Sequence, residues 1–456
     1  MKKSILIYLL LLVLTLMSCT NSYQVSKGIP IAVENTMKDA VKNKHRIGIS
    51  LAFVNEQGIH YSSCGNSQIS GANQISDESV FGVGSLSKIF TALVFADMVA
   101  NSEIKLQTPV NEYLPPSYQV PSSQNDTMRL EHLVTHTSGL PKNLPVIDSN
   151  NSLYKAVSEF SYSFNYGDTY IYSNIGMALL GNILEIESGK KLDQLVAERI
   201  TSPLQMHQTT YDLNKAMNFG LVTGHLEAKP IIEESKENLS LGFVYGGLYA
   251  STKDLSKLIS VYLTDSSTVL FSTLKLTQQK YEETDIGFGW KIKNFEDVDI
   301  FYHGGEQPGY QSFLGFNKEQ GIGVVLMVNS TSQDNIQDIA IHLLTNGEVP
   351  LPDFSFPKEV EITPEYLNRY VGIYKSIDSP EENTFDISIQ NAKLFCVERS
   401  SKGNLIRESI LYAKNETEFY FKEIPLVAKF KTDNDSGNTM LILVLEDKGI
   451  IFEGGR

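Results

Sequence analysis

Residues 87–100 are apolar on most faces of the helix that their pattern predicts. A helix without a broad polar face is stable in water only when other elements enclose it. We therefore expect this segment to be buried inside a domain. The chain has 456 residues, 42% of them hydrophobic, which is enough apolar material to build a large core around such a helix.

Strand and helix patterns alternate from about residue 31 to residue 346. Two pairs of apolar runs predict antiparallel strands, and an amphipathic run predicts a helix that closes the domain. These elements are expected at residues 47–54, 59–62, 311–316, 323–328 and 334–344. The pattern favours a mixed domain of the α+β or α/β class.

The composition and the pattern of the sequence change after residue 346. Residues 347–362 contain prolines that cannot continue a helix or a central strand, so this segment predicts a linker. From residue 363 to residue 456, polar turns separate short alternating strands, which is typical of a small all-β barrel or sandwich. The strands are expected at residues 370–374, 385–389, 393–397, 418–422, 426–430 and 440–445.

The N-terminus predicts an export signal. Two lysines precede a short apolar run at residues 9–14, and the run ends in Leu-Met-Ser-Cys19, which resembles a bacterial lipobox. We expect residues 1–18 to be a lipoprotein signal peptide, Cys19 to carry the lipid, and residues 19–30 to form a polar tether. The expected location is the bacterial cell envelope, as a periplasmic or outer-membrane lipoprotein. The alternative is an ordinary signal peptide with an incidental cysteine.

Charge and cysteine content exclude several partners. The formal net charge is −15, and so acidic a surface repels phosphate backbones, so we expect no nucleic-acid partner. Cys64 and Cys396 are too few for a disulfide framework or a thiolate metal site, and we interpret both as buried apolar side chains. We expect a small-molecule or peptide substrate, no metal and no cofactor, and membrane contact only through the lipid at Cys19.

A glycine-rich turn leads into the apolar helix, in the segment Gly82-Val-Gly-Ser85-Leu-Ser-Lys88. Ser85 and Lys88 are three residues apart and share a helix face, and a lysine whose pKa is lowered by burial can take the proton of a serine. The alternative is that Ser85 caps the helix and Lys88 is solvated. The spacing alone is weak evidence, because it recurs at Ser102, Ser152, Ser188, Ser272 and Ser355.

Two further segments carry polar side chains at the ends of predicted elements. Tyr172 and Asn174 precede an apolar helical stretch, where a phenol can relay a proton and an amide can hold a substrate amide. The alternative is a core tyrosine and a helix cap. Farther on, His303-Gly-Gly305-Glu306 has two glycines that allow a substrate backbone to lie alongside a strand edge. The amide N–H groups of Glu306 and Ser85 can form an oxyanion hole, whereas the alternative for His303 is a half-exposed residue at a strand end.

These three motifs, in this order, resemble those of the serine β-lactamase and penicillin-binding-protein superfamily. The similarity is greatest to its branch of class C β-lactamase-like hydrolases, D,D-carboxypeptidases, D-aminopeptidases and esterases, and it covers about residues 30–346. Other segments also resemble the family, including Leu-Val-Thr-His136-Thr-Ser-Gly-Leu-Pro. The remaining matching segments are residues 203–206, 246–255 and 287–290.

The resemblance implies a fold and a set of roles. The fold is an antiparallel sheet flanked by helices with a mostly helical subdomain at residues 31–346, followed by a lipocalin-like β-barrel at residues 363–456. Ser85 is implied as the acylated nucleophile, Lys88 as its base and Tyr172 as the proton shuttle. Asn174 is implied to hold a substrate amide, and His303 and Gly305 are implied to line the opposite wall of the substrate site. His136 is implied to have a structural role.

The third motif departs from true class C β-lactamases, which place a lysine and a threonine where this chain has His303 and Gly304. Histidine is only partly charged near neutral pH, so carboxylate recognition requires another cation. The motif therefore favours a hydrolase of D-amino-acid peptides, esters or β-lactam-like amides. The alternatives are a class C-type β-lactamase and an envelope lipoprotein that binds penicillin or peptidoglycan fragments without turnover.

Overall fold

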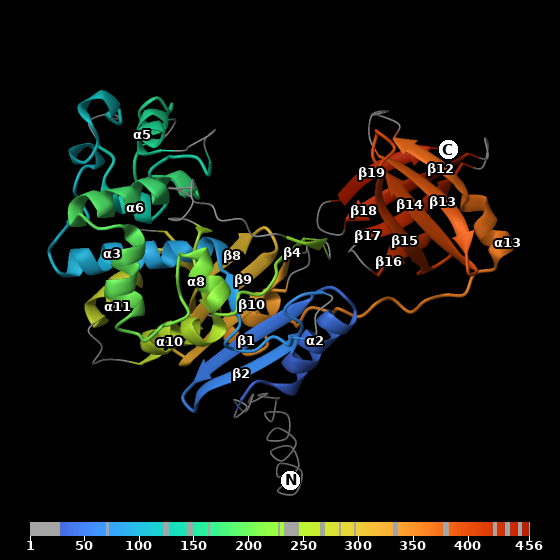
Figure 1. The fold of residues 1–456 in the computed structure, drawn as a ribbon, viewed down its shortest axis with the longest axis horizontal. Helices are drawn as coiled ribbons and strands as arrows, with labels where there is room; N and C mark the ends of the chain where they lie inside the picture. The colour runs from blue at the N-terminus through green and yellow to red at the C-terminus, as the bar shows by residue number, and fades with distance from the viewer. Residues whose placement is uncertain are drawn as a thin grey trace, which may run out of the picture.

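A six-stranded antiparallel sheet with the order β2-β1-β10-β9-β8-β7 forms the centre of the computed structural model (Figure 1). The first and last strands of the domain pair in its middle, where Leu51 of β1 lies opposite Leu326 of β10. Both predicted strand pairs are present. The strands are β1 (Gly48–Asn55), β2 (Gly58–Gly65), β7 (Lys291–Phe295), β8 (Val298–Gln307), β9 (Tyr310–Asn317) and β10 (Ile322–Val328).

The structure describes most of the chain after the N-terminal segment. The expected signal peptide at residues 1–18 and the lipid site at Cys19 lie outside the described residues, as does the tether up to residue 27. Among the described residues, no helix combines the length and apolar character that a membrane crossing requires. The described ranges are 28–69, 73–121, 127–143, 149–162, 165–226, 229–231, 246–264, 270–281, 284–295, 298–331, 336–376, 383–422, 426–433, 438–445 and 449–455.

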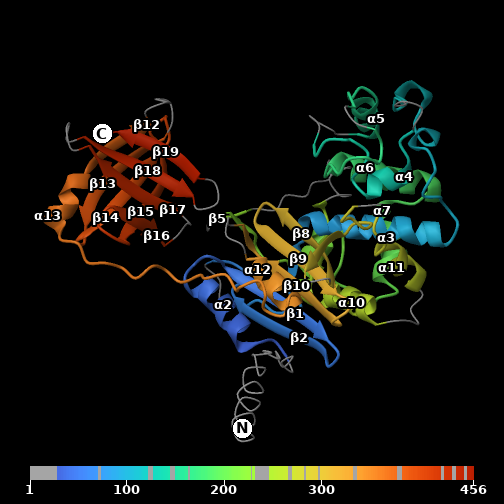
Figure 2. The ribbon, with the colours of Figure 1, turned by 180° about the vertical axis from the view of Figure 1, so that it is seen from behind.

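Helices cover both faces of the sheet (Figures 1 and 2). On one face α2 (Ile31–Lys42) and α12 (Asp338–Leu344) pack against alternate residues of β1 such as Leu51. On the other face α10 (Thr252–Leu263) packs against the residues between them, such as Ala52. Because both faces are covered, β1 is buried along its whole length and is a continuous apolar run rather than an alternating one.

The helix α3 (Ser87–Ala100) lies at the centre of the helical subdomain, as its sequence predicts. Every residue from Ser87 to Met98 is buried. It contacts four helical elements, α6 (Asn174–Ser188), α7 (Leu192–Val196), the π-helical turn η4 (Ala197–Thr201) and α11 (Phe271–Thr277). The other short helices before the linker are η1 (Gly84–Leu86), η2 (Val110–Glu112), η3 (Pro116–Tyr118), α4 (Leu130–Val134), α5 (Asn150–Ser158) and α8 (Leu213–Asn218).

Two small sheets support the main one. One pairs β3 (Val80–Gly82) with β6 (Tyr249–Ser251), and β3 leads directly into the turn before α3. The other has the order β11-β4-β5. Its strands are β4 (His225–Leu226), β5 (Lys229–Pro230) and β11 (Ser330–Thr331).

The C-terminal strands form a closed barrel, which decides between the barrel and sandwich alternatives. Six strands were predicted, and the structure adds β15 and β19. Gly454 and Gly455 of β19 pair with β12 and so close the barrel. The strands are β12 (Gly372–Ser376), β13 (Thr384–Gln390), β14 (Lys393–Arg399), β15 (Leu405–Ala413), β16 (Glu418–Phe421), β17 (Leu426–Thr432), β18 (Thr439–Leu445) and β19 (Gly449–Gly455), preceded by α13 (Pro364–Leu367) and η5 (Asn368–Tyr370).

An extended segment joins the sheet domain to the barrel (Figure 1). Its Phe356 ring stacks on His45 of the sheet domain at 5.4 Å between centroids and on Tyr420 of the barrel at 5.7 Å. The Asn43 side chain donates a hydrogen bond to the carbonyl oxygen of Phe354 at 2.9 Å. The middle of the segment is therefore held by contacts to both domains.

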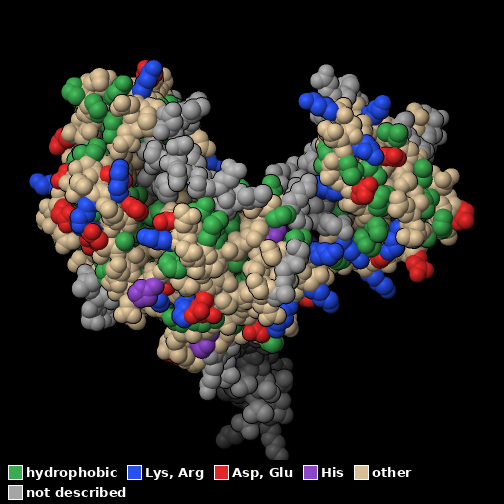
Figure 3. Space-filling model, in the orientation of Figure 1, with side chains coloured by type: hydrophobic (Ala, Val, Ile, Leu, Met, Phe, Trp, Pro, Cys, Tyr) green, Lys and Arg blue, Asp and Glu red, His purple; other side chains and the backbone are tan. Residues whose placement is uncertain are grey.

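The two cysteines of the described chain belong to different cores. Cys64 lies half-buried on β2, Cys396 is buried in the barrel, and both are free thiols. Within the described residues, no cluster of His, Cys, Asp and Glu is arranged to hold a metal ion. On the face seen in Figure 3, Lys and Arg side chains are interspersed with Asp and Glu.

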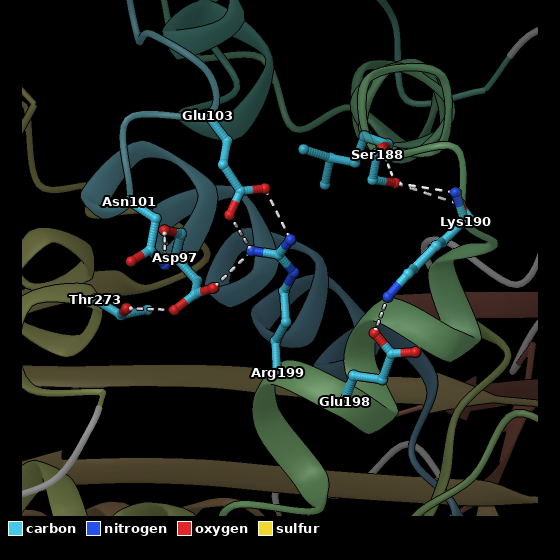
Figure 4. A network of polar contacts seen from close by, with 9 residues as sticks. Asp97, Asn101, Glu103, Ser188, Lys190, Glu198, Arg199 and Thr273 are labelled. Carbon is cyan, nitrogen blue, oxygen red and sulfur yellow. Dashed lines mark hydrogen bonds and ion pairs between the residues drawn. The ribbon is translucent and has the colours of Figure 1, made fainter.

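Arg199 of η4 forms hydrogen bonds with acidic residues at and beyond the C-terminal end of α3 (Figure 4). Its guanidinium donates to Asp97 of α3 at 2.9 Å and to both carboxylate oxygens of Glu103 at 2.8 and 2.7 Å. The other oxygen of Asp97 accepts a hydrogen bond from Thr273 of α11 at 3.1 Å. The Asp97 side chain is only 12% exposed, so this carboxylate depends on these donors.

We expect Arg199→Ala to lower the free energy of unfolding by about 1–3 kcal/mol, because it removes a charged partner from a largely buried carboxylate. The measurement is urea unfolding followed by circular dichroism. Lys190→Ala is the matched control, since its pair with Glu198 is about half exposed on both sides, and its effect should stay within about 0.5 kcal/mol. Equal effects of the two substitutions would contradict the supporting role of Arg199.

Candidate active site

The turn between β3 and α3 places Ser85 at the start of the buried helix. Gly84 has a φ of +52°, and a Cβ atom there would lie 2.6 Å from the carbonyl oxygen of Glu306 and 2.7 Å from its amide nitrogen. No larger residue fits this contact. The backbone of the turn therefore lies directly against the backbone of β8, which brings the Ser85 region next to Glu306.

Side-chain hydrogen bonds hold this turn in place. The hydroxyl group of Ser87 donates to the carbonyl oxygen of Gly84 at 2.7 Å and accepts from the amide of Leu248 at 3.1 Å. Ser312 of β9 donates to the carbonyl oxygen of Val83 at 2.8 Å. The nucleophile candidate is thus fixed by contacts to β9 and to the segment before β6.

Lys88 lies one helical turn after Ser85, and its Nζ atom hydrogen-bonds to the Ser85 Oγ atom at 3.0 Å. The Lys88 side chain is fully buried. Burial, and then the positive charges of Lys142 and Lys291, hold the pKa of Lys88 well below its usual range. A neutral amine at hydrogen-bond distance from a hydroxyl group can accept its proton, and the solvated Lys88 of the alternative interpretation is wrong.

Tyr172 lies over the same two residues. Its ring centroid is 4.9 Å from Lys88 Nζ, 4.7 Å from the His136 ring and 6.1 Å from the His303 ring. Burial raises the pKa of Tyr172, and the interaction of the phenol with Ser85 opposes this shift. Tyr172 is therefore a protonated phenol at neutral pH. It can pass a proton on as a donor, without first becoming a phenolate.

Asn174 begins α6 but does not cap it, because the cap is Ser173, whose hydroxyl group accepts from the amide of Gly176 at 2.8 Å. The Asn174 side-chain nitrogen donates to Asn143 at 2.8 Å. Its Oδ1 atom is buried and has no hydrogen-bond partner among the described residues. An unsatisfied acceptor of this kind can receive a donor from a ligand.

His303 is buried within β8, so the half-exposed position considered from the sequence is wrong. Its Nδ1 atom lies 2.7 Å from the carbonyl oxygen of Gly304. Burial is the largest cause that lowers the pKa of His303, to about 3. The ring is therefore neutral at physiological pH, with Nδ1 donating to the carbonyl and Nε2 as an acceptor.

The two glycines after His303 are needed for packing inside the protein. A Cβ atom on Gly305 would lie 2.1 Å from the carbonyl oxygen of Val83 and 2.3 Å from the Ser312 hydroxyl group. One on Gly304 would lie 3.0 Å from the side chain of Gln337. This differs from the sequence interpretation, in which the glycines made room for substrate, because the space beside Gly305 is already filled by the turn before Ser85.

His136 has the structural position expected for it. Its Nδ1 atom accepts the amide of Ser173 at 3.1 Å, so it holds the start of α6. Burial keeps its pKa well below the usual range.

Sequence reasoning missed two residues of the site, Lys142 and Lys291. Each follows a segment quoted for the resemblance, residues 133–141 and 287–290, so their position beside a matching segment was the available signal.

One cavity of about 370 Å³ is lined by residues of α7, η4 and α8 together with Leu248. Neither Ser85 nor Lys88 nor Tyr172 lines it. The cavity is thus distinct from the cluster around Ser85.

The structure brings Ser85, Lys88, Tyr172 and His303 together, and the cluster can be compared with known proteins. The family model described as Beta-lactamase matches residues 33–347. The D-alanyl-D-alanine-carboxypeptidase/endopeptidase AmpH of Escherichia coli (strain K12) is 24% identical over 309 residues, covering 60% of this chain and 79% of that protein. Penicillin-binding protein 4* of Bacillus subtilis (strain 168) is 24% identical over 446 residues, covering 89% and 95%.

A solved structure shows the same fold. The octameric penicillin-binding protein homologue from Pyrococcus abyssi aligns with a TM-score of 0.62 at 18% identity, covering 93% of this chain and 99% of that chain. The predicted fold class, a β-lactamase-like domain followed by a β-barrel, is confirmed.

We expect Lys88→Met to raise the melting temperature at pH 7, because a buried lysine forced to be neutral destabilises the folded state. The pKa of Lys88 is lowered on folding, so the unfolded chain binds more protons below about pH 10.4. The stability gain should therefore shrink as the pH rises toward that value. Thermal unfolding at pH 7 and pH 10 measures it.

Lys155→Met, on an exposed face of α5, is the control and should leave the melting temperature unchanged at both pH values. A Lys88→Met protein that is no more stable than the wild type at pH 7 would argue against a neutral, buried amine.

Proposed function

The chain belongs to the beta-lactamase family, and from this premise we propose that it is a serine hydrolase that forms an acyl-enzyme on Ser85. The observation that carries the proposal is the Lys88 amine, 3.0 Å from the Ser85 hydroxyl group and with a lowered pKa. A serine hydroxyl is a weak acid, so it becomes a nucleophile only when a base lies within hydrogen-bond reach.

The acylation step follows from these positions. The Lys88 amine takes the Ser85 proton while Oγ attacks the substrate carbonyl carbon, and the backbone N–H groups of Ser85 and Glu306 stabilise the oxyanion. When the carbon–nitrogen or carbon–oxygen bond breaks, Tyr172 donates its proton to the leaving group and regains one from Lys88. Tyr172 and Lys88 then take a proton from water as it attacks the acyl carbon, and they return this proton to the Ser85 Oγ atom as the bond to the acyl group breaks.

The proposed substrates are D-amino-acid peptides, esters or β-lactam-like amides. The partnerless Oδ1 atom of Asn174 supports a substrate with an amide N–H group beside the scissile bond. The relatives include a protein named as a D-alanyl-D-alanine carboxypeptidase and endopeptidase, which fits such a substrate. His303 and Gly305 would line the opposite wall.

Two alternatives follow from the same site. A class C-type β-lactamase is disfavoured because His303, where those enzymes have a lysine, is neutral. A lipoprotein that binds penicillin or peptidoglycan fragments without turnover would use Lys88 for acylation at most and would stop at the acyl-enzyme. We also propose that the protein is exported and anchored in the bacterial cell envelope through a lipid on Cys19.

We expect Ser85→Ala to abolish labelling by a fluorescent penicillin and to lower kcat/KM on the best acyl substrate by about 10³-fold or more, because the nucleophile is removed. The panel consists of D-Ala-D-Ala peptides, D-aminoacyl amides, p-nitrophenyl acetate and nitrocefin. Ser152→Ala is the matched control, since Ser152 also precedes a lysine by three residues on a helix and should behave as the wild type.

The outcomes separate the alternatives. Stoichiometric labelling of Ser85 without turnover of any substrate would favour the binding protein. Rapid, Ser85-dependent hydrolysis of nitrocefin in preference to peptides would favour the β-lactamase. Wild-type rates equal to those of Ser85→Ala on every substrate would reject the hydrolase.

A further inference from the structure

The site contains no positive charge on the strand where relatives have a lysine. His303 occupies that position on β8, and its ring is neutral because it is buried. A carboxylate on the substrate therefore gains nothing from this strand beyond hydrogen bonds. If the protein acts on a substrate with such a group, the charge that binds it must come from another element.

Lys291 supplies a charge next to Tyr172. Its Nζ atom lies 5.7 Å from the centroid of the Tyr172 ring. Lys291 is the first residue of β7 and is paired with Tyr302, the residue before His303. The β7–β8 ladder ends at this pair. Lys291 therefore lies at the point where β8 stops pairing with β7. The β8 segment from His303 to Glu306 continues beyond this point without a β7 partner.

Lys142 contributes a second charge near the site. Its carbonyl oxygen accepts the backbone N–H of Asn174 at 3.0 Å, and its side chain is exposed. Both lysines act on the buried centre of the site, since each helps to lower the pKa of Lys88. Among the residues that the structure describes, no carboxylate lies within ion-pair distance of either ammonium group.

In the proposed reaction the leaving group lies next to Tyr172, the residue that Lys291 approaches. In the proposed mechanism the Ser85 Oγ atom bonds to the carbonyl carbon, the backbone N–H groups of Ser85 and Glu306 hold its oxygen, and Tyr172 protonates the departing nitrogen or oxygen atom. In an amino-acid leaving group the carboxylate carbon is two bonds from that nitrogen, about 2.5 Å away. A group that touches the Tyr172 hydroxyl can therefore extend its carboxylate past the phenol ring toward Lys291.

We infer that Lys291, assisted by Lys142, binds the carboxylate of the leaving group and selects substrates whose C-terminal residue is released as a free amino acid. This inference rests on the proposed acyl-enzyme function and narrows its substrate class. It assigns to β7 a specificity role that replaces the missing charge on β8. Lysine binds a carboxylate as a point charge with rotatable donors, so Arg at this position should retain the preference in part.

The test compares an N-acylated D-Ala-D-Ala peptide with its C-terminal amide, which has the same scissile bond and no terminal charge. We expect the wild type to prefer the acid, by about 10-fold or more in kcat/KM. In Lys291→Met this acid-to-amide ratio should fall toward one, and in Lys291→Arg it should be partly kept. Lys293→Met is the matched control on the same strand, with an exposed side chain that lies over Phe295, and it should keep the ratio.

A binding measurement makes the result independent of turnover. In the Ser85→Ala background, calorimetry should show tighter binding of the acid than of the amide, and Lys291→Met should remove the difference. The inference is overturned if Lys291→Met keeps the acid preference, or if the wild type has none. The proposed function still stands in that case, provided that the amide peptide is hydrolysed in a Ser85-dependent way. Absence of Ser85-dependent turnover on both peptides, with no acid preference in binding, rejects both.

Discussion

The burial of a lysine amine against the Ser85 hydroxyl group is the constraint around which the candidate site is built. A lysine loses its charge only where water and carboxylates are kept away. That environment exists because α3 is apolar on almost all sides and four helical elements enclose it. The apolar pattern that forces the helix into the core is thus also what lowers the pKa of Lys88.

Around Ser85 and Lys88, the buried histidines are neutral and the more exposed lysines at the edge of the site are positively charged. His136 and His303 are both uncharged because both are buried. Lys142 and Lys291 stand at the edge, in a protein whose formal net charge is −15. This local excess of positive charge runs against the average of the chain. After burial, these two charges lower the pKa of Lys88 further, because each neighbouring cation makes a proton on Lys88 less favourable.

The sequence was informative where short-range pattern decides the structure. The burial of α3, the β1–β2 hairpin and the β9–β10 pair follow from apolar periodicity, and the grouping of Ser85, Lys88, Tyr172 and Asn174 follows from the resemblance of their motifs. Properties created by tertiary contacts were not accessible. Burial of His303, the raised pKa of Tyr172 and the approach of Lys291 depend on segments distant in the chain. The strands β15 and β19 were missed because polar residues in one and terminal glycines in the other obscure their alternation.

The contact of Gly84 with Glu306 has a consequence for how the two halves of the domain fit together. Ser85 belongs to the turn before the helical subdomain, whereas the strand that carries Glu306 belongs to the sheet, and at Gly84 the two backbones meet without a side chain between them. A separation of the two parts by the width of one methyl group would break this contact while leaving Ser85 and Lys88 hydrogen-bonded to each other. The spacing between Ser85 and the β8 backbone therefore reports whether the two halves of the domain are docked.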